Sequence, residues 1–163
     1  MTDQAQSPRV LIVGFGNPLM ADDGAGPALV AALCGRALPP SARVVDGGSD
    51  ATTLAGVWRG EREVWLVDAV IAGAPAGTIH RRGHDEVLGV AQRHATAHAL
   101  SLPECLRWLV VAYPEMAAVR YRLWGIEAGR VTLEAGLSPE VARAVAALAE
   151  EIVTELGAGG AGG

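Results

Sequence analysis

Apolar and polar positions along this chain follow two periods, one typical of buried strands and one typical of helices. Residues 9–14 form a continuous apolar run that ends in glycine, which is the pattern of a strand buried on both faces. Residues 42–46 and 63–68 predict two more strands, and residues 77–82 predict a short one. Residues 119–128 predict a later strand in which apolar and polar positions alternate.

Apolar residues at helical spacing lie between these segments. They predict a helix over residues 24–36, where Pro27 falls in the first turn and is therefore tolerated. A second helix is predicted over residues 99–111, and the clearest one over residues 138–156, with Ser138 as its N-cap. Strands that alternate with helices predict an α/β fold, a three-layer sandwich whose central, mostly parallel sheet is flanked by helices on both faces.

Composition narrows the class of protein. The 163 residues are half hydrophobic and carry a net charge of −5, which fits one globular domain and argues against a nucleic-acid or anionic-membrane partner. We expect a flexible N-terminus over residues 1–8, a single domain over 9–156 and a disordered Gly/Ala tail over 157–163. No apolar stretch predicts a membrane helix, and Cys34 and Cys105 lack metal-site spacing. The chain is therefore expected to be a soluble, cytoplasmic monomer.

The segment VLIVGFGNPLMADDGAG, residues 10–26, begins like a nucleotide-binding loop but places Asp22 and Asp23 where the next helix should start. The dinucleotide-binding fingerprint requires a third glycine where this chain has Leu19. Both aspartates would also repel a pyrophosphate from the helix N-terminus. One aspartate is expected to cap the helix, and the remaining negative charge favours a cation as the ligand.

Carboxylates follow three of the predicted strands. Asp23 comes after the first strand, Asp46 ends the second and Asp68 ends the third. Ligands of such sheets bind beyond the carboxyl ends of the strands, near the point where the strand order reverses. We therefore expect these three side chains to converge on one rim of the sheet.

The segment DGGSDA after the second predicted strand nearly matches the G-x-S-x-G nucleophile elbow. The chain order Ser49, Asp68, His98 also matches the order of a hydrolase triad. Against this, two aspartates flank the serine and would oppose the oxyanion that such a site must stabilise. A Gly-Gly turn in which Ser49 or Asp50 caps a helix is the simpler interpretation, and a serine hydrolase stays open as the alternative.

Four histidines lie in the middle of the chain. His80 and His84 stand beside arginines and are expected to be solvated surface groups. His94 and His98 are four residues apart, close enough to bind one ion if the segment is helical. His98 precedes a predicted helix. Cys105 lies about 10 Å further along that helix, too far to form a thiol protease pair with His98.

The motifs GFGNPLMADDGAG, DGGSDA, LVDAV and TAHALSL, followed by a final amphipathic helix, occur in the order seen in the nickel–iron hydrogenase maturation endopeptidases. The chain resembles this family over residues 9 to about 156. The resemblance implies an α/β fold and an aspartic-type endopeptidase activity. It also implies the partner, a hydrogenase large-subunit precursor, whose C-terminal extension is removed after nickel has been inserted.

The resemblance further implies a metal-contacting site. The acidic residue of the family's opening loop falls on Asp23, the Asp after the third strand on Asp68, and the His before the next helix on His98. The family's DGG turn places Asp46 along the cleft in a supporting position. Some relatives have Glu in place of Asp23, and the pattern around the histidine differs, so His94 is the alternative ligand.

Two carboxylates and one imidazole suit a divalent ion of borderline softness, such as nickel or zinc. In this family the nickel arrives bound to the substrate, so the site would detect whether the metal is present, and other divalent ions such as zinc could occupy it. A non-catalytic metal-binding scaffold for hydrogenase maturation would use the same ligands. It therefore stays open beside the endopeptidase.

Overall fold

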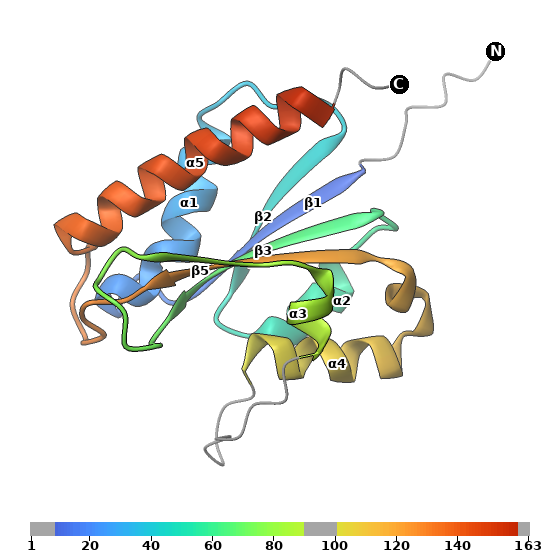
Figure 1. Ribbon diagram of the computed structural model, residues 1–163, viewed down its shortest axis with the longest axis horizontal. Coiled ribbons are helices and arrows are strands. Elements are labelled where there is room, and N and C mark those ends of the chain that lie inside the picture. The colour runs from blue at the N-terminus through green and yellow to red at the C-terminus, as the bar shows by residue number, and fades with distance from the viewer. Residues whose placement is uncertain (1–8, 90–100, 160–163) are drawn as a thin grey trace.

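The computed structural model describes residues 9–89 and 101–159. Within these ranges one five-stranded sheet has the order β2-β1-β3-β5-β4 (Figure 1). The strands are β1 (Val10–Phe15), β2 (Ala42–Gly48), β3 (Glu63–Val70), β4 (Ile79–Arg82) and β5 (Arg120–Glu127). All neighbours pair in parallel except β4, which pairs antiparallel with β5 at the edge. The predicted mostly parallel sheet is confirmed.

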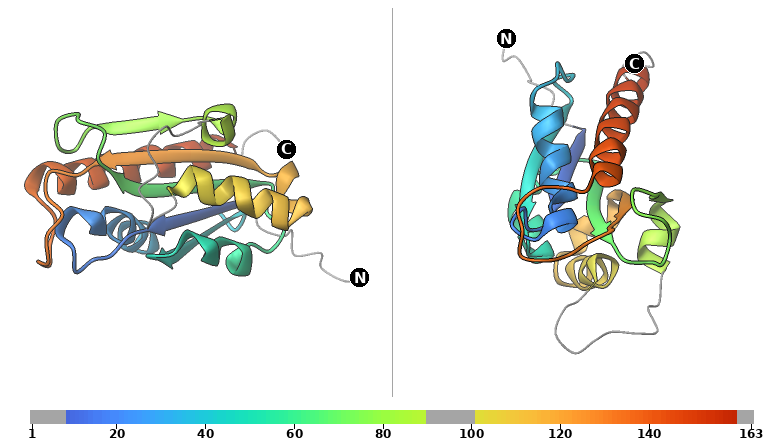
Figure 2. Two further views of the ribbon diagram at one scale, coloured as in Figure 1. Left: turned by 90° about the horizontal axis from the view of Figure 1, so that it is seen from below. Right: turned by 90° about the vertical axis from the view of Figure 1, so that its left-hand side faces the viewer.

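Helices cover both faces of the sheet, as Figures 1 and 2 show. One face carries α1 (Ala25–Cys34) and α5 (Pro139–Gly159), and the other carries α2 (Leu54–Val57), α3 (His84–Gly89) and α4 (Leu102–Ala112). The described residues also form three 3-10 turns, η1 (Ala21–Gly24), η2 (Ala51–Thr53) and η3 (Pro114–Ala118). The predicted three-layer sandwich is therefore confirmed.

Each face of the sheet has its own hydrophobic core. Leu11 and Val13 of β1 belong to the core beneath α2, α3 and α4. Ile12, which lies between them, belongs to the core beneath α1 and α5. Because successive side chains of a strand point to opposite faces, a strand covered on both sides must be apolar at every position. This explains why the strand reads as one continuous apolar run in the sequence.

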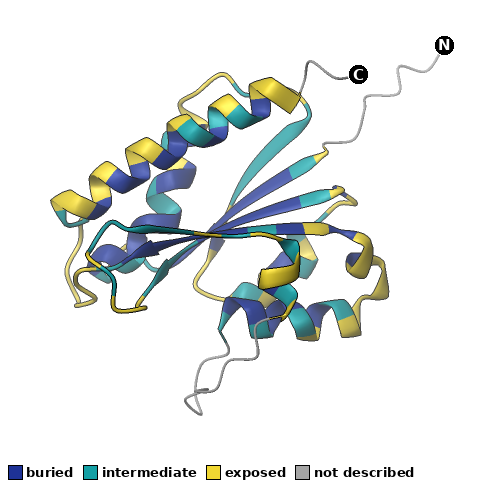
Figure 3. Ribbon diagram, in the orientation of Figure 1, coloured by how far each residue is buried: buried dark blue, intermediate teal, exposed yellow. Residues whose placement is uncertain are grey.

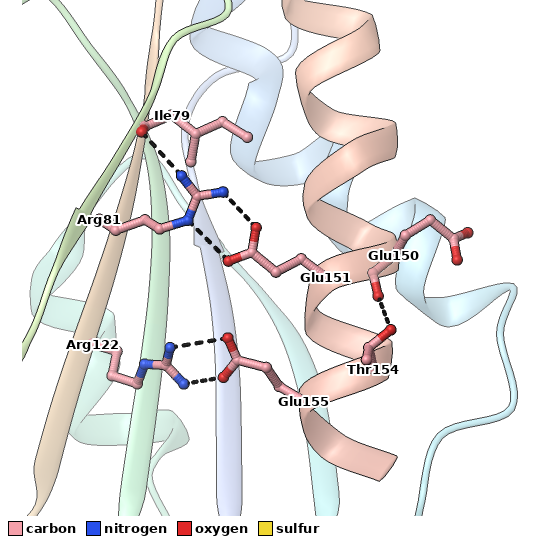
Figure 4. Close-up of polar contacts among 7 residues, drawn as sticks. All are labelled: Ile79, Arg81, Arg122, Glu150, Glu151, Thr154 and Glu155. Carbon is pink, nitrogen blue, oxygen red and sulfur yellow. Dashed lines mark hydrogen bonds and ion pairs between the residues drawn. The ribbon is translucent and has the colours of Figure 1, made fainter. Parts of the chain in front are cut away.

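The long helix α5 is fastened to the sheet by ion pairs as well as by its buried inner face (Figure 3). Arg81 of β4 pairs with Glu151, and Arg122 of β5 pairs with Glu155 (Figure 4). Both arginines therefore point to the face that α5 covers. The side chains next to them on β4 and β5 point to the opposite face, where the cavity described below lies.

The predicted C-terminal boundary of the domain needs an extension. Helix α5 begins directly after Ser138, as predicted, but it continues through Gly159, so residues 157–159 of the predicted tail are helical. The predicted flexible residues 1–8 and the rest of the tail, 160–163, lie outside the described residues. In the part of the chain that the structure describes, no helix has the length and apolar character needed to cross a membrane.

The first three strands create the reversal of strand order that positions the candidate site. From β1 the chain passes through α1 to β2, and it then returns across β1 to β3 on the other side. Gly14 of β1 pairs with Asp46 of β2 and with Val67 of β3, so the carboxyl ends of the three strands lie level. Parallel sheets bind their ligands at this kind of edge.

Candidate active site

Asp22 is fully buried and holds the loop between β5 and α5. Its carboxylate accepts four hydrogen bonds, from the backbone N–H groups of Gly129, Arg130 and Ser138 and from the hydroxyl of Ser138, at 2.7–2.9 Å. Burial alone would raise the pKa of Asp22, but these hydrogen bonds outweigh it and lower the pKa below its ordinary value. Asp22 is therefore an ionised structural anchor.

The expectation that one of the twin aspartates caps the following helix is wrong. Neither η1 nor α1 has a side-chain cap. Asp22 instead accepts the N–H of Ser138, the residue that precedes the distant helix α5. The hydroxyl of Ser138, predicted as an N-cap, donates to Asp22. Local helix-capping statistics could not reveal this pairing because its partners are more than a hundred residues apart in the sequence.

Asp23 is turned differently from its neighbour. It is only partly buried, and its Oδ2 accepts the backbone N–H of Asn17 at 2.8 Å. This hydrogen bond fixes the carboxylate against the loop that follows β1. Asp23 is therefore the carboxylate that the opening loop leaves for another role, as expected for one member of the pair.

Asp68 lies near the end of β3 and close enough to Asp23 for the two charges to interact. Burial and the negative charge of Asp23 together raise the pKa of Asp68 to about 7, although the backbone N–H of Ala69 partly opposes this. The structure thus brings Asp23 and Asp68 to the same rim of the sheet. Both burial and the like charge of Asp23 favour the protonated form of Asp68, and strongly shifted pKa values of this kind are typical of functional sites.

The Asp46 side chain does not lie with those of Asp23 and Asp68. Like Val67, it lies opposite Gly14, so both point to the face that α1 and α5 cover. Asp68, one position after Val67, points to the other face. The Asp46 carboxylate is exposed and accepts the N–H of Gly48 at 2.9 Å, which stabilises its own turn. The expected convergence of three carboxylates is therefore seen for Asp23 and Asp68 but not for Asp46.

The DGGSDA segment forms a turn and a cap, as the simpler interpretation predicts. Asp50 is the cap, because its Oδ1 accepts the N–H of Thr52 at 2.9 Å and the hydroxyl of the same residue at 2.7 Å. Ser49 is exposed. Gly47 admits no side chain, since a Cβ there would lie 2.4 Å from the ring of Phe15. The segment is thus packed as a tight connection between β2 and η2.

His94 and His98 lie outside the described residues, so the third predicted ligand, its alternative and the third member of the serine triad have no described position. Within 9–89 and 101–159, no group of three His, Cys, Asp or Glu side chains could hold a metal ion. Of the predicted set, the structure places Asp23 and Asp68 together. The assignment of a histidine to the site stays a prediction.

The expectation that His80 and His84 are free surface groups is wrong. His80 donates its Nε2–H to Oε2 of Glu127 at 2.8 Å, and Glu127 is buried. Burial would raise the pKa of Glu127, but the hydrogen bonds from His80 and from two backbone N–H groups lower it, so the carboxylate stays ionised. His84 accepts the backbone N–H of Tyr121 at 3.1 Å and stacks on its ring.

A cavity of about 290 Å³ opens beside Asp68, between the sheet and the start of α4. Ser101 caps this helix through a reciprocal pair of hydrogen bonds with Glu104. The cavity is lined by Asp68, Ala69, Val70, Ile71, Ala72, His80, Arg82, Ser101, Leu102, Pro103, Leu123 and Gly125. The acidic rim therefore adjoins a hollow with both apolar and charged walls, which is the form of a ligand site.

Comparisons with known proteins agree on one family. The family model described as hydrogenase maturation protease matches residues 27–155. A Methanocaldococcus jannaschii protein named for this protease family is 31% identical over 149 residues, covering 90% of this chain and 96% of that protein. The hydrogenase 2 maturation protease of Escherichia coli is 26% identical over 152 residues, covering 91% and 90%.

Solved structures show the same fold. The hydrogenase maturating endopeptidase HybD from Escherichia coli superposes with a TM-score of 0.78 at 24% identity, covering 93% of this chain and 94% of that one. The [NiFe] hydrogenase maturation protease HybD from Thermococcus kodakarensis gives a TM-score of 0.73 at 28% identity, covering 91% and 98%. The likeness extends over nearly the whole chain in both cases.

Proposed function

The chain belongs to the hydrogenase maturation protease family, and from this premise we propose how its acidic rim serves a peptidase reaction. The enzyme removes the C-terminal extension of a nickel–iron hydrogenase large-subunit precursor, and Asp23 and Asp68 recognise the nickel that the precursor carries. The observation that supports this assignment is the meeting of two mutually repelling carboxylates at the carboxyl ends of the parallel strands.

The chemistry of the two carboxylates fits a divalent cation. Burial, together with the repulsion between them, raises the pKa of Asp68 to about 7, and a cation between the two carboxylates would remove the repulsion. Carboxylate oxygens are ligands for nickel and zinc, and His98, which the family resemblance assigns to the site, would add an imidazole nitrogen. A divalent ion held here would act as a Lewis acid beside the scissile peptide bond.

The residues around the acidic rim then have separate roles. Asn17 holds the carboxylate of Asp23 in place through its N–H, and Asp68, partly buried near the end of β3, lines the cavity. The cavity beside Asp68 gives room for the polypeptide that carries the metal. Ser49 is given no part in the reaction, since it stands in the exposed turn that Asp50 caps.

The test is cleavage of a nickel-loaded large-subunit precursor, followed as a mobility shift on a gel. Asp23→Asn and Asp68→Asn should each remove most of the activity while the proteins stay folded, because amides bind a cation far more weakly than carboxylates. Asp85→Asn is the matched control, since it deletes an exposed carboxylate on α3. That helix contacts Tyr121 near the far end of β5.

Four outcomes would count against the proposal. Full activity of Asp23→Asn would exclude the acidic rim from recognition. Equal cleavage of nickel-free precursor would exclude metal sensing. Loss of cleavage in a folded Ser49→Ala protein would instead favour the serine hydrolase, and an uncut precursor with wild-type protein would favour a non-catalytic scaffold.

A further inference from the structure

The cavity beside Asp68 has a row of residues across its floor. Gly125 of β5 pairs with Asp68 of β3 on one side and with His80 of β4 on the other. Residues paired in this way point to the same face of a sheet, so Asp68 and His80 both face the cavity. Because adjacent strands lie about 4.8 Å apart, their backbones are separated by roughly 10 Å. Gly125 between them contributes no side chain, and the side chain of Val70 packs over it, 2.8 Å from where a Cβ would lie. All of these residues line the cavity.

Arg82 faces the same cavity from one step further along β4. It stands two positions after His80 and therefore points to the same face, whereas Arg81 points to the opposite face and pairs with Glu151 (Figure 4). Within 9–89 and 101–159, the guanidinium of Arg82 forms no ion pair or hydrogen bond. Arg82 thus lines the cavity without a counter-charge from the described part of the protein.

Neither Asp68 nor Glu127 neutralises Arg82. Asp68 lies two strands away, and its pKa is governed by burial, by Asp23 and by Ala69 rather than by an arginine. Glu127 is already occupied by His80 and by the backbone N–H groups of Ala72 and Gly73. A partly buried guanidinium without a partner is costly, and carboxylates are the groups that match its planar donors.

The remaining walls suit a short stretch of peptide. Leu102, Pro103 and Leu123 give apolar contacts, and Ile71 stands at the opening with 79% of its surface exposed. The volume of about 290 Å³ corresponds to the share of roughly ten waters in the liquid. This is enough for a few side chains but not for a folded element.

We propose that this cavity binds the segment of the precursor next to the scissile bond, and that the guanidinium of Arg82 pairs with a carboxylate of that segment. The identity of the polypeptide rests on the proposed function, whereas the recognition of a peptide carboxylate rests on the cavity itself. The carboxylate comes from an acidic side chain or from the free C-terminus of the extension. Both present the same group to Arg82.

Binding of three synthetic probes separates these sources. The first is a pentapeptide of alanine and valine with a central glutamate and both ends capped. The second is the same peptide with glutamine, and the third is the glutamine peptide with a free C-terminus. Titration into ¹⁵N-labelled protein should move the backbone amide signals of the cavity residues. The carboxylate that is used should bind about tenfold more tightly than the capped glutamine peptide.

Variants of β4 supply the matched comparison. Arg82→Gln should weaken binding of the carboxylate probe about tenfold and Arg82→Lys by less, because lysine keeps the charge but loses the planar fork. Arg81→Gln, on the opposite face of the same strand, should leave binding unchanged. Thermal melts of all three variants show whether they are folded. Equal affinity for all three peptides, or undiminished binding by folded Arg82→Gln, would refute the site.

Cleavage kinetics link the cavity to the reaction. In the precursor assay Arg82→Gln should raise KM about tenfold and change kcat by less than about twofold, as expected when uniform substrate binding is lost. If wild-type protein cuts no precursor while Arg82-dependent peptide binding persists, the proposed function fails and the carboxylate site stands. If cleavage is normal and Arg82→Gln changes neither binding nor KM, the carboxylate site fails and the proposed function stands.

Discussion

Asp22→Ala is expected to be among the most destabilising single substitutions in this protein. The side chain is fully buried and accepts four hydrogen bonds from the segment between β5 and α5. A hydrogen bond to a charged group contributes about 1.5–3 kcal/mol, but four bonds to one carboxylate are not additive. Removing one partner from a buried network costs about 3–5 kcal/mol, and we expect a loss of that size.

The loss should be visible as a lower melting temperature. For a domain of this length, 1 kcal/mol corresponds to about 2–4 °C, so a loss of about 3–5 kcal/mol should make Asp22→Ala melt roughly 6–20 °C below wild type. The melting temperature of Asp22→Asn should lie between those of wild type and Asp22→Ala, because its amide presents an N–H₂ group to the N–H and O–H groups that donate to Asp22. Asp23→Asn is the matched control one residue away and should melt near wild type, since among the described residues its carboxylate accepts only the N–H of Asn17.

Amide hydrogen exchange tests the mechanism as well as the magnitude. The N–H groups of Gly129, Arg130 and Ser138 should lose protection in Asp22→Ala and keep it in Asp23→Asn. Acidification should have a related effect. The pKa of Asp22 is lowered on folding, so its stabilisation is complete above the ordinary value of 3.8 and is lost as the pH falls through the lowered pKa. A loss below about 1 kcal/mol with the three amides still protected would refute the anchor.

Three further substitutions test the site and the fold. The pKa of Asp68 is about 7 when folded, against 3.8 ordinarily, so its charge destabilises the fold as the pH rises through this window. In urea unfolding, the free energy of unfolding of Asp68→Asn should rise relative to that of wild type by about 1–2 kcal/mol as the pH is changed from 5 to 8. This value is reduced for the partial exposure of Asp68. Gly26→Ala should cost about 3 kcal/mol or more in the same assay, since its Cβ would lie 2.1 Å from a β1 carbonyl oxygen, whereas Gly56→Ala should be neutral. Glu61→Ala should cost about 3 kcal/mol in thermal melts, because Arg43 would lose its carboxylate partner and keep only its hydrogen bond to the Val57 carbonyl among the described residues.

Much of the fold could be predicted because the local spacing of apolar residues indicates its strands and helices. Strands that are covered on both faces must be apolar throughout, and the strands around residues 9–14 and 63–68 were recognised on that basis. The placement of Asp23 and Asp68 at one rim followed from the rule that parallel strands end on the same side. The position of Asp46 did not follow, because the face to which a strand-end residue points depends on register.

Pairings between distant segments could not be predicted from the sequence. Asp22 and Asp23 are chemically identical neighbours, and only the loop that ends at Ser138 distinguishes them. His80 looked like a surface residue because its partner, Glu127, lies on the next strand of the sheet but 47 positions away in the chain. Such contacts depend on tertiary packing, and no local pattern in one sequence carries them.

A strained turn points the side chains of Asp22 and Asp23 in different directions and so gives them different roles. Ala21 has a φ of +49°, a conformation that costs a residue with a Cβ about 1–2 kcal/mol. Its N–H donates to Glu134 at 2.7 Å, and the Asp22 carboxylate anchors the adjoining loop, so the surroundings hold Ala21 in this conformation. The turn sends Asp22 inward, and the next side chain, Asp23, reaches the rim. The buried carboxylate of Asp22, which accepts four hydrogen bonds, therefore positions the partly buried carboxylate of Asp23 near Asp68. The cation of a metal-bearing substrate would offset the repulsion between these two like charges.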